Sequence, residues 1–396
     1  MKLQFPYGFL WGSATASYQV EGGIENNDWA QAAREGIVPP CGRGCDHYNL
    51  FEQDFDIIQG LAQNAHRFSI EWSRIEPEEG KYDEEALEHY LTVLRALDRR
   101  GIVPFVTLWH FTLPTWLSRR GGFAHKDTPA IFARYCARVT EHFAKEFPRL
   151  HVMTINEPLV FASKGYIEGS WAPFKKRRFL KFLLVAHNLI RGHRLAHDAI
   201  KAVVPDMQIG IAKNNMYFYA TNRNPIWIGA AAFMSWAWNR HFVNRIADKQ
   251  DFIGLNYYMH KPFGPKNGPR SAGREKPLAK NDMGWDIYPE GLYRTLTELA
   301  RYNKPLYITE NGLADAGDKL RKQFIIDHLT EVHRALQHGA QVRGYFYWSL
   351  MDNYEWAHGF GPRFGLIEIS YDTRERHVRP SASVYKEICE TNTLTI

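Results

Sequence analysis

The stretch PLYITENG, residues 305–312, contains a short apolar segment that ends in a carboxylate. Residues 306–309 are apolar or β-branched, as is typical of strands, and Glu310 follows them directly. The Asn311-Gly312 dipeptide that comes next is, taken alone, a strong signal for a two-residue hairpin turn. The local sequence leaves two alternatives open. Either Glu310 lies at the polar edge of a hairpin, or a buried strand carries it into a cleft.

Segments of the same kind recur along the chain and alternate with helical patterns. In residues 84–101 and 128–147, apolar residues recur at intervals of three and four, which indicates helices. Apolar strands separated by helices are typical of a parallel sheet covered on its outer face. The expected strands are residues 9–14, 65–70, 103–108, 151–156, 207–212, 251–256, 305–310 and 342–349.

Eight such units in 396 residues predict an α/β fold, a closed (β/α)8 barrel that forms a single domain over residues 1–396. A doubly wound sheet is the alternative, but no Gly-x-Gly-x-x-Gly motif follows the first strand. In a βα barrel the carboxyl ends of the strands face the functional site. The barrel therefore favours the second reading of Glu310, with Asn311-Gly312 starting a loop.

Composition and charge exclude several classes of protein. The net charge of +6 is small for this length, and the one dense basic run, residues 175–178, is interpreted as a solvated helix start and not as a nucleic-acid patch. No segment approaches the length of a membrane span, and the amino terminus lacks the long apolar run of a signal peptide. We expect a cytoplasmic protein with no nucleic-acid or membrane partner. Cys41 and Cys45 lack a second cysteine pair, so no zinc site is predicted.

Polar side chains cluster where the apolar strands end. They are Gln19 after the first strand, Arg67 in the second, His110 after the third, Asn156 and Glu157 at the fourth, Asn256 and Tyr258 at the sixth, Glu310 at the seventh, and Trp348 with Glu355 and Trp356 at the eighth. One such residue would be an ordinary helix cap or loop anchor. Seven strands ending in this way predict a functional site at the mouth of the barrel.

Two of these residues, Glu157 and Glu310, form the pair of carboxylates that glycoside hydrolysis requires. Each alone could be a capping group for a following helix. Glu310 is expected to share the mouth with Arg67 and Tyr258, and a cation and a phenol favour the ionised form that a nucleophile needs. Glu157 has no cation near it in sequence, which suits a general acid that keeps its proton.

The motifs TINEP (154–158) and YITENG (307–312) resemble the acid/base and nucleophile signatures of glycoside hydrolase family 1, the β-glucosidase family. The resemblance extends over nearly the whole chain. It includes FLWGSATASYQVEGG near the start, RFSIEWSRIEPEEG, TLWHFTLP, GLNYY, and WSLMDNYEWAHGFGPRFGLIEISYDT near the end. The family resemblance implies a TIM barrel that acts on β-glycosides.

The resemblance also implies a role for each matching residue. Glu310 would be the nucleophile and Glu157 the acid/base of a retaining, double-displacement reaction that releases a non-reducing terminal β-D-glucosyl residue. No metal or organic cofactor is implied, and the partner is a small β-glycoside. The substrate-binding residues would be Gln19, His110, Asn156, Asn256, Tyr258, Trp348, Glu355, Trp356 and Phe364, with Arg67 and Tyr258 supporting the nucleophile.

Two residues bear on the choice of sugar. Glu355 would repel a phosphate at that end of the site, so a neutral sugar is expected. Phe111 stands where many members of the family have Trp, which keeps β-galactosidase or β-fucosidase activity open as an alternative. A non-catalytic sugar-binding barrel is the alternative from a different class of protein, and the intact carboxylate pair argues against it.

Overall fold

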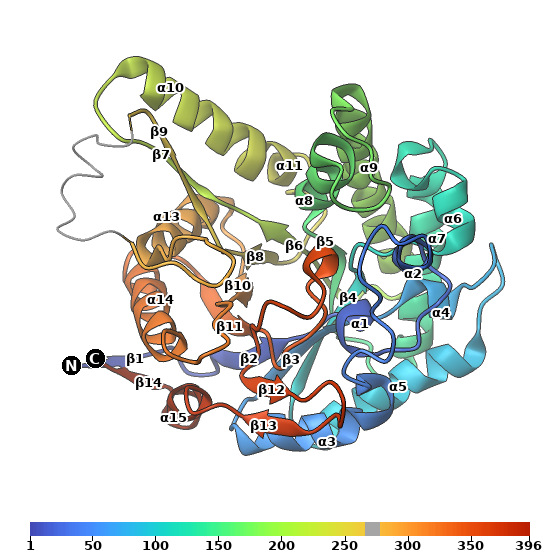
Figure 1. Cartoon of the computed structure of the whole chain (residues 1–396), viewed down its shortest axis with the longest axis horizontal. Coiled ribbons are helices and arrows are strands. Elements are labelled where there is room, and N and C mark those ends of the chain that lie inside the picture. Colours follow the sequence, from blue (N-terminus) through green and yellow to red (C-terminus); the bar gives the residue numbers. More distant parts are fainter. Residues whose placement is uncertain (266–277) are drawn as a thin grey trace.

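A closed barrel of eight parallel strands occupies the centre of the computed structural model, which describes residues 1–265 and 278–396 (Figure 1). The strands follow the order β10-β11-β2-β3-β4-β5-β6-β8 around the barrel. Every predicted strand is present, with each boundary within two residues of the expected one, so the predicted (β/α)8 barrel is confirmed. Their bounds are β2 Leu10–Ala14, β3 Ala65–Ser69, β4 Val103–Trp109, β5 His151–Asn156, β6 Gln208–Asn214, β8 Ile253–Asn256, β10 Leu306–Asn311 and β11 Val342–Trp348.

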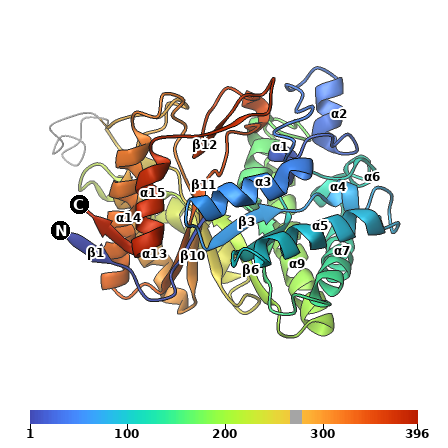
Figure 2. The ribbon, with the colours of Figure 1, turned by 90° about the horizontal axis from the view of Figure 1, so that it is seen from below.

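Helices cover the outside of the barrel (Figures 1 and 2). The longer ones are α3 His47–Gly60, α5 Glu84–Asp98, α7 Thr128–Ala144, α9 Phe179–Val203, α10 Pro225–Met234, α13 Pro289–Leu299, α14 Arg321–Gln337 and α15 Ala382–Thr391. Shorter ones are α1 Ser17–Val20, α2 Asp28–Arg34, α4 Trp72–Ile75, α6 Thr115–Arg119, α8 Pro158–Ser163 and α11 His241–Asn244. Single turns are η1 Gly122–Ala124, η2 Lys164–Glu168, η3 Ser235–Arg240, η4 Ala300–Tyr302 and η5 Trp356–His358. Within the described ranges, no helix is both long enough and apolar enough to cross a membrane.

Among the described residues, three small strand pairs lie outside the barrel, and the sequence patterns did not predict them. The termini pair with each other through β1 Lys2–Gln4 and β14 Thr393–Thr395, which places both chain ends side by side (Figure 1). The other pairs are β7 Tyr217–Ala220 with β9 His260–Phe263, and β12 Ile367–Ile369 with β13 Arg376–Val378. Strands of three or four residues carry too little periodicity to be recognised from sequence.

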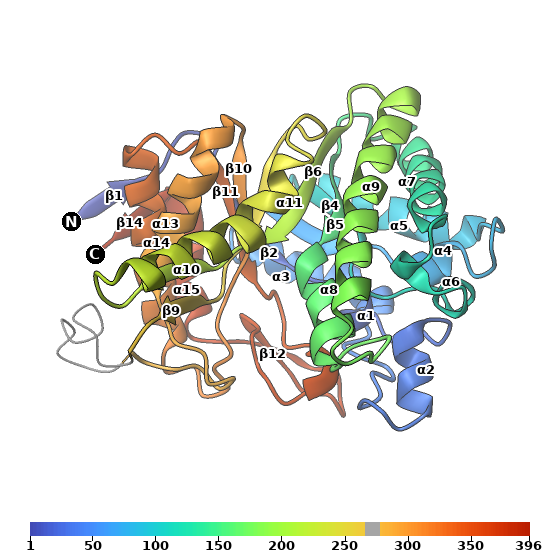
Figure 3. The same cartoon turned by 90° about the horizontal axis from the view of Figure 1, so that it is seen from above.

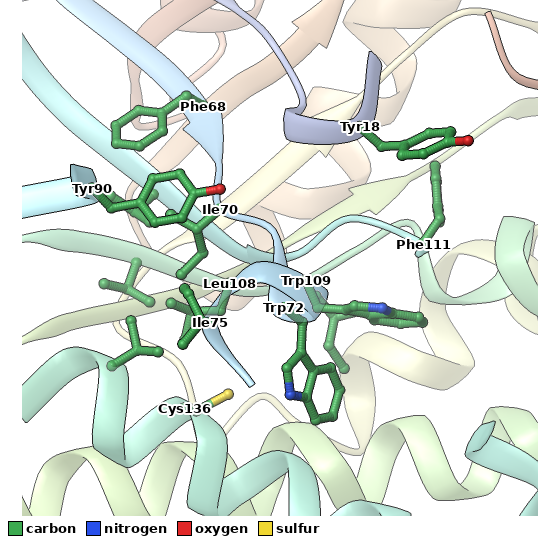
Figure 4. Close-up of a cluster of buried hydrophobic side chains, with 14 of the residues drawn as sticks. Tyr18, Phe68, Ile70, Trp72, Ile75, Tyr90, Leu108, Trp109, Phe111 and Cys136 are labelled. Atoms are coloured by element: carbon green, nitrogen blue, oxygen red, sulfur yellow. The ribbon is translucent and has the colours of Figure 1, made fainter. Parts of the chain in front are cut away.

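Successive residues of each barrel strand point alternately toward the barrel interior and toward the surrounding helices. Phe68 of β3 and Leu108 of β4 pack outward with Tyr90 of α5 and Cys136 of α7 in one apolar cluster (Figure 4). Phe105 of β4 belongs instead to the cluster inside the barrel, so both faces of the strands are buried. Burial on both faces explains why these strands are apolar runs and not alternating ones.

The end of β10 shows why Asn311-Gly312 does not form a hairpin. The side-chain amide of Asn311 donates to the carbonyl oxygen of Tyr257 at 2.7 Å, and its oxygen accepts from Tyr345 at 2.9 Å. Gly312 lies so close to β11 that a Cβ atom at this position would be 1.6 Å from the carbonyl oxygen of Trp348. Contacts with neighbouring strands therefore explain why Asn and Gly stand at these two positions. The chain does not turn back in a hairpin but continues from Glu310 into a loop at the barrel mouth.

Gly312→Ala should destabilise the fold and reduce function together, because its Cβ meets backbone that cannot move aside without shifting β11. We expect a loss of roughly 2–3 kcal/mol or more in the free energy of unfolding, measured by urea denaturation. Gly317→Ala in the same loop is the matched control, since its Cβ would meet only the Lys319 side chain at 3.5 Å or more. Equal stability of the two variants would contradict this account.

Candidate functional site

A cavity of about 370 Å³ opens at the carboxyl ends of the barrel strands. Ten of the twelve predicted site residues line it, namely Gln19, His110, Asn156, Glu157, Tyr258, Glu310, Trp348, Glu355, Trp356 and Phe364. The other two, Arg67 and Asn256, are fully buried and hydrogen-bond the lining carboxylates. The fold therefore brings the polar residues predicted at the strand ends together around one cavity.

Glu310, at the end of β10, is held through both of its carboxylate oxygens. Arg67 Nη1 donates to Oε1 at 2.5 Å, and the Tyr258 hydroxyl donates to Oε2 at 2.8 Å. Burial and the adjacent Glu310 charge raise the pKa of Tyr258 well above its usual value, so the phenol stays a donor. The predicted neighbours of Glu310 are thus both in contact with it, and they fix the orientation of its carboxylate.

Arg67 connects this carboxylate to two further strands, β4 and β5, and to the backbone of β10. Its guanidinium also donates to Thr309 O at 3.1 Å, to Thr107 Oγ1 at 3.1 Å and to Asn156 Oδ1 at 2.7 Å. The side chain comes from β3 and is 1% exposed. A buried guanidinium whose donors are directed to several strands acts as a rigid support for the floor of the cavity.

Glu157 lies directly after β5 in a different environment. Two amides donate to the same oxygen, Oε1, from Asn256 at 2.9 Å and from Asn214 at 3.2 Å. Burial, followed by the charge of Glu310, raises the pKa of Glu157 to about 7. Although Glu157 precedes α8, its side chain makes no hydrogen bond that caps this helix. The alternative of a capping carboxylate is therefore wrong, and the group is a carboxyl that holds its proton near neutral pH.

The placement of Asn256 differs in detail from the expected one. The family resemblance implied a substrate-binding role, whereas its amide donates to Glu157 and to Asn156 Oδ1 and its oxygen accepts from Thr309. Asn256 ends β8, between β6 and β10 in the barrel, so it reaches the neighbouring carboxyl from below. It supports the predicted acid and not the predicted nucleophile.

Several buried polar atoms of the cavity wall have no hydrogen-bond partner within the described residues. They are Gln19 Oε1, His110 Nδ1 and Glu355 Oε2. Burial and the Arg67 charge lower the pKa of His110 well below its usual value, so the imidazole is neutral and can both donate and accept. Because buried polar atoms are normally paired, these three mark positions where a polar ligand with several hydroxyl groups fits.

Glu355 corrects one expectation about the sugar. Burial, with the charges of Glu310 and Glu157 adding to it, raises the pKa of Glu355 to about 8. The group is thus largely protonated at neutral pH, and repulsion of a phosphate by a charged Glu355 is a weaker argument than the sequence suggested. A protonated carboxyl can donate one hydrogen bond and accept another, as a hydroxyl ligand requires.

Flat aromatic faces form much of the remaining wall. The imidazole of His110 is nearly parallel to the indoles of Trp348 and Trp356, at interplanar angles of 14° and 10°. Trp356 also contacts Phe111, with ring centroids 5.2 Å apart. Such faces pack against the C–H surfaces of a sugar ring, while the polar atoms between them bind its hydroxyls. Phe364 lies near Trp285 on the outer part of the wall.

The outer part of the cavity contains residues that the sequence argument missed. They are Met216, Trp171, Trp238, Met283 and Trp285. These residues lie in loops or short helices beyond the strand ends, where no periodicity marks a position as facing the site. The high aromatic content, 14% of the chain, was the only signal for the three tryptophans, and the two methionines had none.

Lys213 is the most consequential residue that was missed. It lies in β6, is fully buried, and donates to the carbonyl oxygen of Asn214 and to Asn215 Oδ1. Burial lowers its pKa to about 7, an effect opposed by the charges of Glu157 and Glu298. Its ammonium lies 5.5 Å from the ring centroid of Trp238. No cation lies near Glu157 in the sequence, as expected, but in the fold β6 brings Lys213 close enough to interact electrostatically with it. A lysine inside an apolar strand was the signal that could have revealed it.

The described residues contain no cluster of three or more His, Cys, Asp or Glu side chains that could hold a metal ion. Cys41 and Cys45 are free thiols, and both are buried. They donate to the carbonyl oxygens of Tyr18 and Asp352. The cavity wall itself contains carboxyl, amide, imidazole and aromatic groups.

The chain matches the sequence model of Glycosyl hydrolase family 1 over residues 1–244 and 237–394. It is 36% identical to a 1,4-beta-D-glucan glucohydrolase of Thermotoga neapolitana, over 99% of both chains. It is 32% identical to a beta-galactosidase of Sulfolobus acidocaldarius, over 98% of this chain and 96% of the relative. The solved beta-glycosidase from Pyrococcus horikoshii superposes with a TM-score of 0.91 at 40% identity, over 100% of this chain and 97% of that one. With the sequence match, the shared barrel and the carboxyl pair at its mouth, the chain belongs to glycosyl hydrolase family 1.

Proposed function

We propose that the chain is a retaining exo-β-glycosidase that hydrolyses the terminal β-D-glucosyl bond of β-glucosides. One observation carries the proposal, the placement of two carboxyl groups in one cavity with opposite surroundings. Glu310 is paired with a guanidinium, whereas Glu157 is held by neutral amides with its pKa raised to about 7. Two carboxyl groups in one cavity, one in an ion pair and the other bound by neutral amides, are the two groups that double displacement requires.

In the first step of the proposed reaction, a carboxylate oxygen of Glu310 attacks the anomeric carbon. The bond from this carbon to the leaving oxygen breaks, and Glu157 gives its proton to that oxygen, so an alcohol departs and a glycosyl ester of Glu310 remains. In the second step, Glu157 takes a proton from water, whose oxygen attacks the same carbon and displaces Glu310. Two inversions return the sugar with its original configuration.

A β-galactosidase or β-fucosidase activity is the second candidate. Phe111 contacts Trp356 beside the predicted sugar site and lacks the indole N–H of a tryptophan, and one relative is named a beta-galactosidase. The values of kcat/KM for aryl β-glucoside, β-galactoside and β-fucoside separate the two candidates. A non-catalytic sugar-binding barrel predicts no turnover of any of the three.

Glu310→Gly should lose roughly 10⁴-fold or more of kcat for an aryl β-glucoside, because no group can then form the ester. Azide, which fits the space left by the side chain, should restore part of the turnover and yield the glycosyl azide of inverted configuration, detected by NMR. Glu375→Gly removes an exposed carboxylate and should leave the rate unchanged. Near-normal turnover of Glu310→Gly without azide would show that another group is the nucleophile.

Glu157→Ala should affect substrates according to their leaving group. We expect roughly 10²–10⁴-fold loss for alkyl glucosides and cellobiose, whose alkoxides need a proton, and a much smaller loss in the first step for nitrophenyl glucosides. Steady-state and burst kinetics on a series of leaving groups measure this difference. Equal losses across the series would remove Glu157 from the role of acid.

The pH dependence of kcat/KM should report the protonation of Glu157. A general acid is active when protonated, so kcat/KM should fall as the pH rises through about 7. Lys213 and Glu157 interact electrostatically, and a cation favours the ionised carboxylate. Lys213→Met should therefore raise the pKa of Glu157 and move the alkaline limb to higher pH.

The matched control is Lys322→Met, an exposed position on α14. It should leave the pH profile unchanged while removing the same charge from the chain. An alkaline limb that stays in place or moves down in Lys213→Met would contradict the electrostatic link between Lys213 and Glu157.

A further inference from the structure

Helix α10 has a composition that does not match its surroundings. Its sequence, PIWIGAAAFM, contains no charged or polar side chain, and a helix that is apolar all round is normally buried. Here Ala231 is the one residue of the helix that is buried. Ile226 is 71% exposed and Phe233 is 60% exposed, and Trp236 in the following turn is exposed as well.

The first turns of α9 show the same feature. Leu180, Leu183 and Leu184 follow the spacing of one helix face, and together with Phe179 they are all exposed; Leu180 is 83% exposed. The helix begins to pack on the core at Val185. These four side chains thus project beyond the body of the molecule without contributing to its core.

The two exposed segments lie on one face of the molecule. Figure 1 shows α9 and α10 along the same edge, and Figure 3, seen from above, shows both in front. We call the surface formed by residues 179–184 and 226–236 the α9–α10 face. Exposed apolar side chains scattered singly need no explanation, but two groups of them on the same side of the molecule indicate an interaction surface.

The chain segments that contain this face are rich in basic residues. Residues 169–197 contain seven Lys and Arg and no Asp or Glu, and residues 207–247 also contain no Asp or Glu. Five of these cations, Lys175, Lys176, Arg177, Arg178 and Lys181, are exposed at the start of α9. Within the part of the chain that the structure describes, none of the five pairs with a carboxylate. Lys175, Arg178 and Lys181 line a cavity of about 540 Å³ beside the helix, and Asp28 is part of its wall.

We propose that the α9–α10 face docks on a membrane surface that contains anionic lipids. Bulky apolar side chains beside a row of Lys and Arg are the features of helices that lie in the headgroup region, with the cations on lipid phosphates. A second copy of the chain is a poorer occupant, because two such basic faces would repel each other. The sequence predicted no membrane partner because it has no spanning segment, but docking of this kind requires none.

The test measures binding of the whole chain to large unilamellar vesicles by co-sedimentation. One set of vesicles is pure phosphatidylcholine, and the other contains 30% phosphatidylglycerol. We expect binding to the anionic vesicles, which weakens in 0.5 M NaCl and on the neutral vesicles. We expect vesicle binding at least about tenfold weaker for each of two double variants, Leu180→Gln/Leu183→Gln and Ile226→Gln/Phe233→Gln. In both, apolar side chains that enter the lipid are replaced by polar ones. Lys176→Glu/Lys181→Glu should lose the preference for anionic lipid.

The control variants alter exposed residues elsewhere. Val378→Gln lies on β13 at the opposite edge in Figure 1, and Lys322→Glu lies on α14; both should bind as the unaltered chain does. All variants should keep the thermal unfolding profile and the activity on a soluble aryl glucoside. The proposal is overturned if the unaltered chain does not bind anionic vesicles, or if the α9–α10 variants bind as well as the controls. It is also overturned if sedimentation velocity shows a dimer that the α9–α10 variants disrupt while vesicle binding is absent.

Discussion

The buried guanidinium of Arg67 is the interaction on which the geometry of the site depends. It rises from β3 inside the barrel and donates to β4, β5 and β10 at once, with Glu310 as its charged partner. Removing two charges from water is costly, and a buried ion pair is retained when its remaining donors and acceptors are also satisfied. Here they are satisfied by Thr107, Thr309 and Asn156. The barrel therefore holds one carboxylate in one orientation at the floor of the cavity.

Glu157, the second carboxyl group, differs from Glu310 because, among the described residues, no guanidinium is bound to it. Glu157 is bound by the amides of Asn256 and Asn214, which orient one oxygen without neutralising its charge. Burial and the nearby Glu310 then favour the protonated form. Lys213 acts in the opposite direction, and its own charge is limited by burial. Two identical side chains thus have different charge and hydrogen-bond surroundings, which is what acid catalysis beside a nucleophile requires.

The sequence predicted the barrel and most of the cavity wall because both follow from simple patterns. Apolar strands alternating with helices fix the fold, and the fold places strand-end residues such as Glu157 and Glu310 at one mouth. Local signals were less reliable. Asn311-Gly312 is typical of a hairpin, but the contacts with Tyr257 and Trp348 that select these residues come from other strands. Lys213 and Trp238 escaped prediction because only tertiary structure brings Lys213 near Glu157 and Trp238 to the cavity wall.

The central claim is that Glu310 becomes covalently bonded to the sugar, and intact-protein mass spectrometry tests it most directly. A 2-deoxy-2-fluoro-β-glucoside with a good leaving group slows the second step more than the first, so the ester should accumulate. The account predicts one added 2-deoxy-2-fluoroglucosyl mass per chain, located by peptide fragmentation on Glu310, and its release when a second acceptor sugar is supplied. Full turnover with no covalent adduct, or an adduct on any other residue, would contradict it.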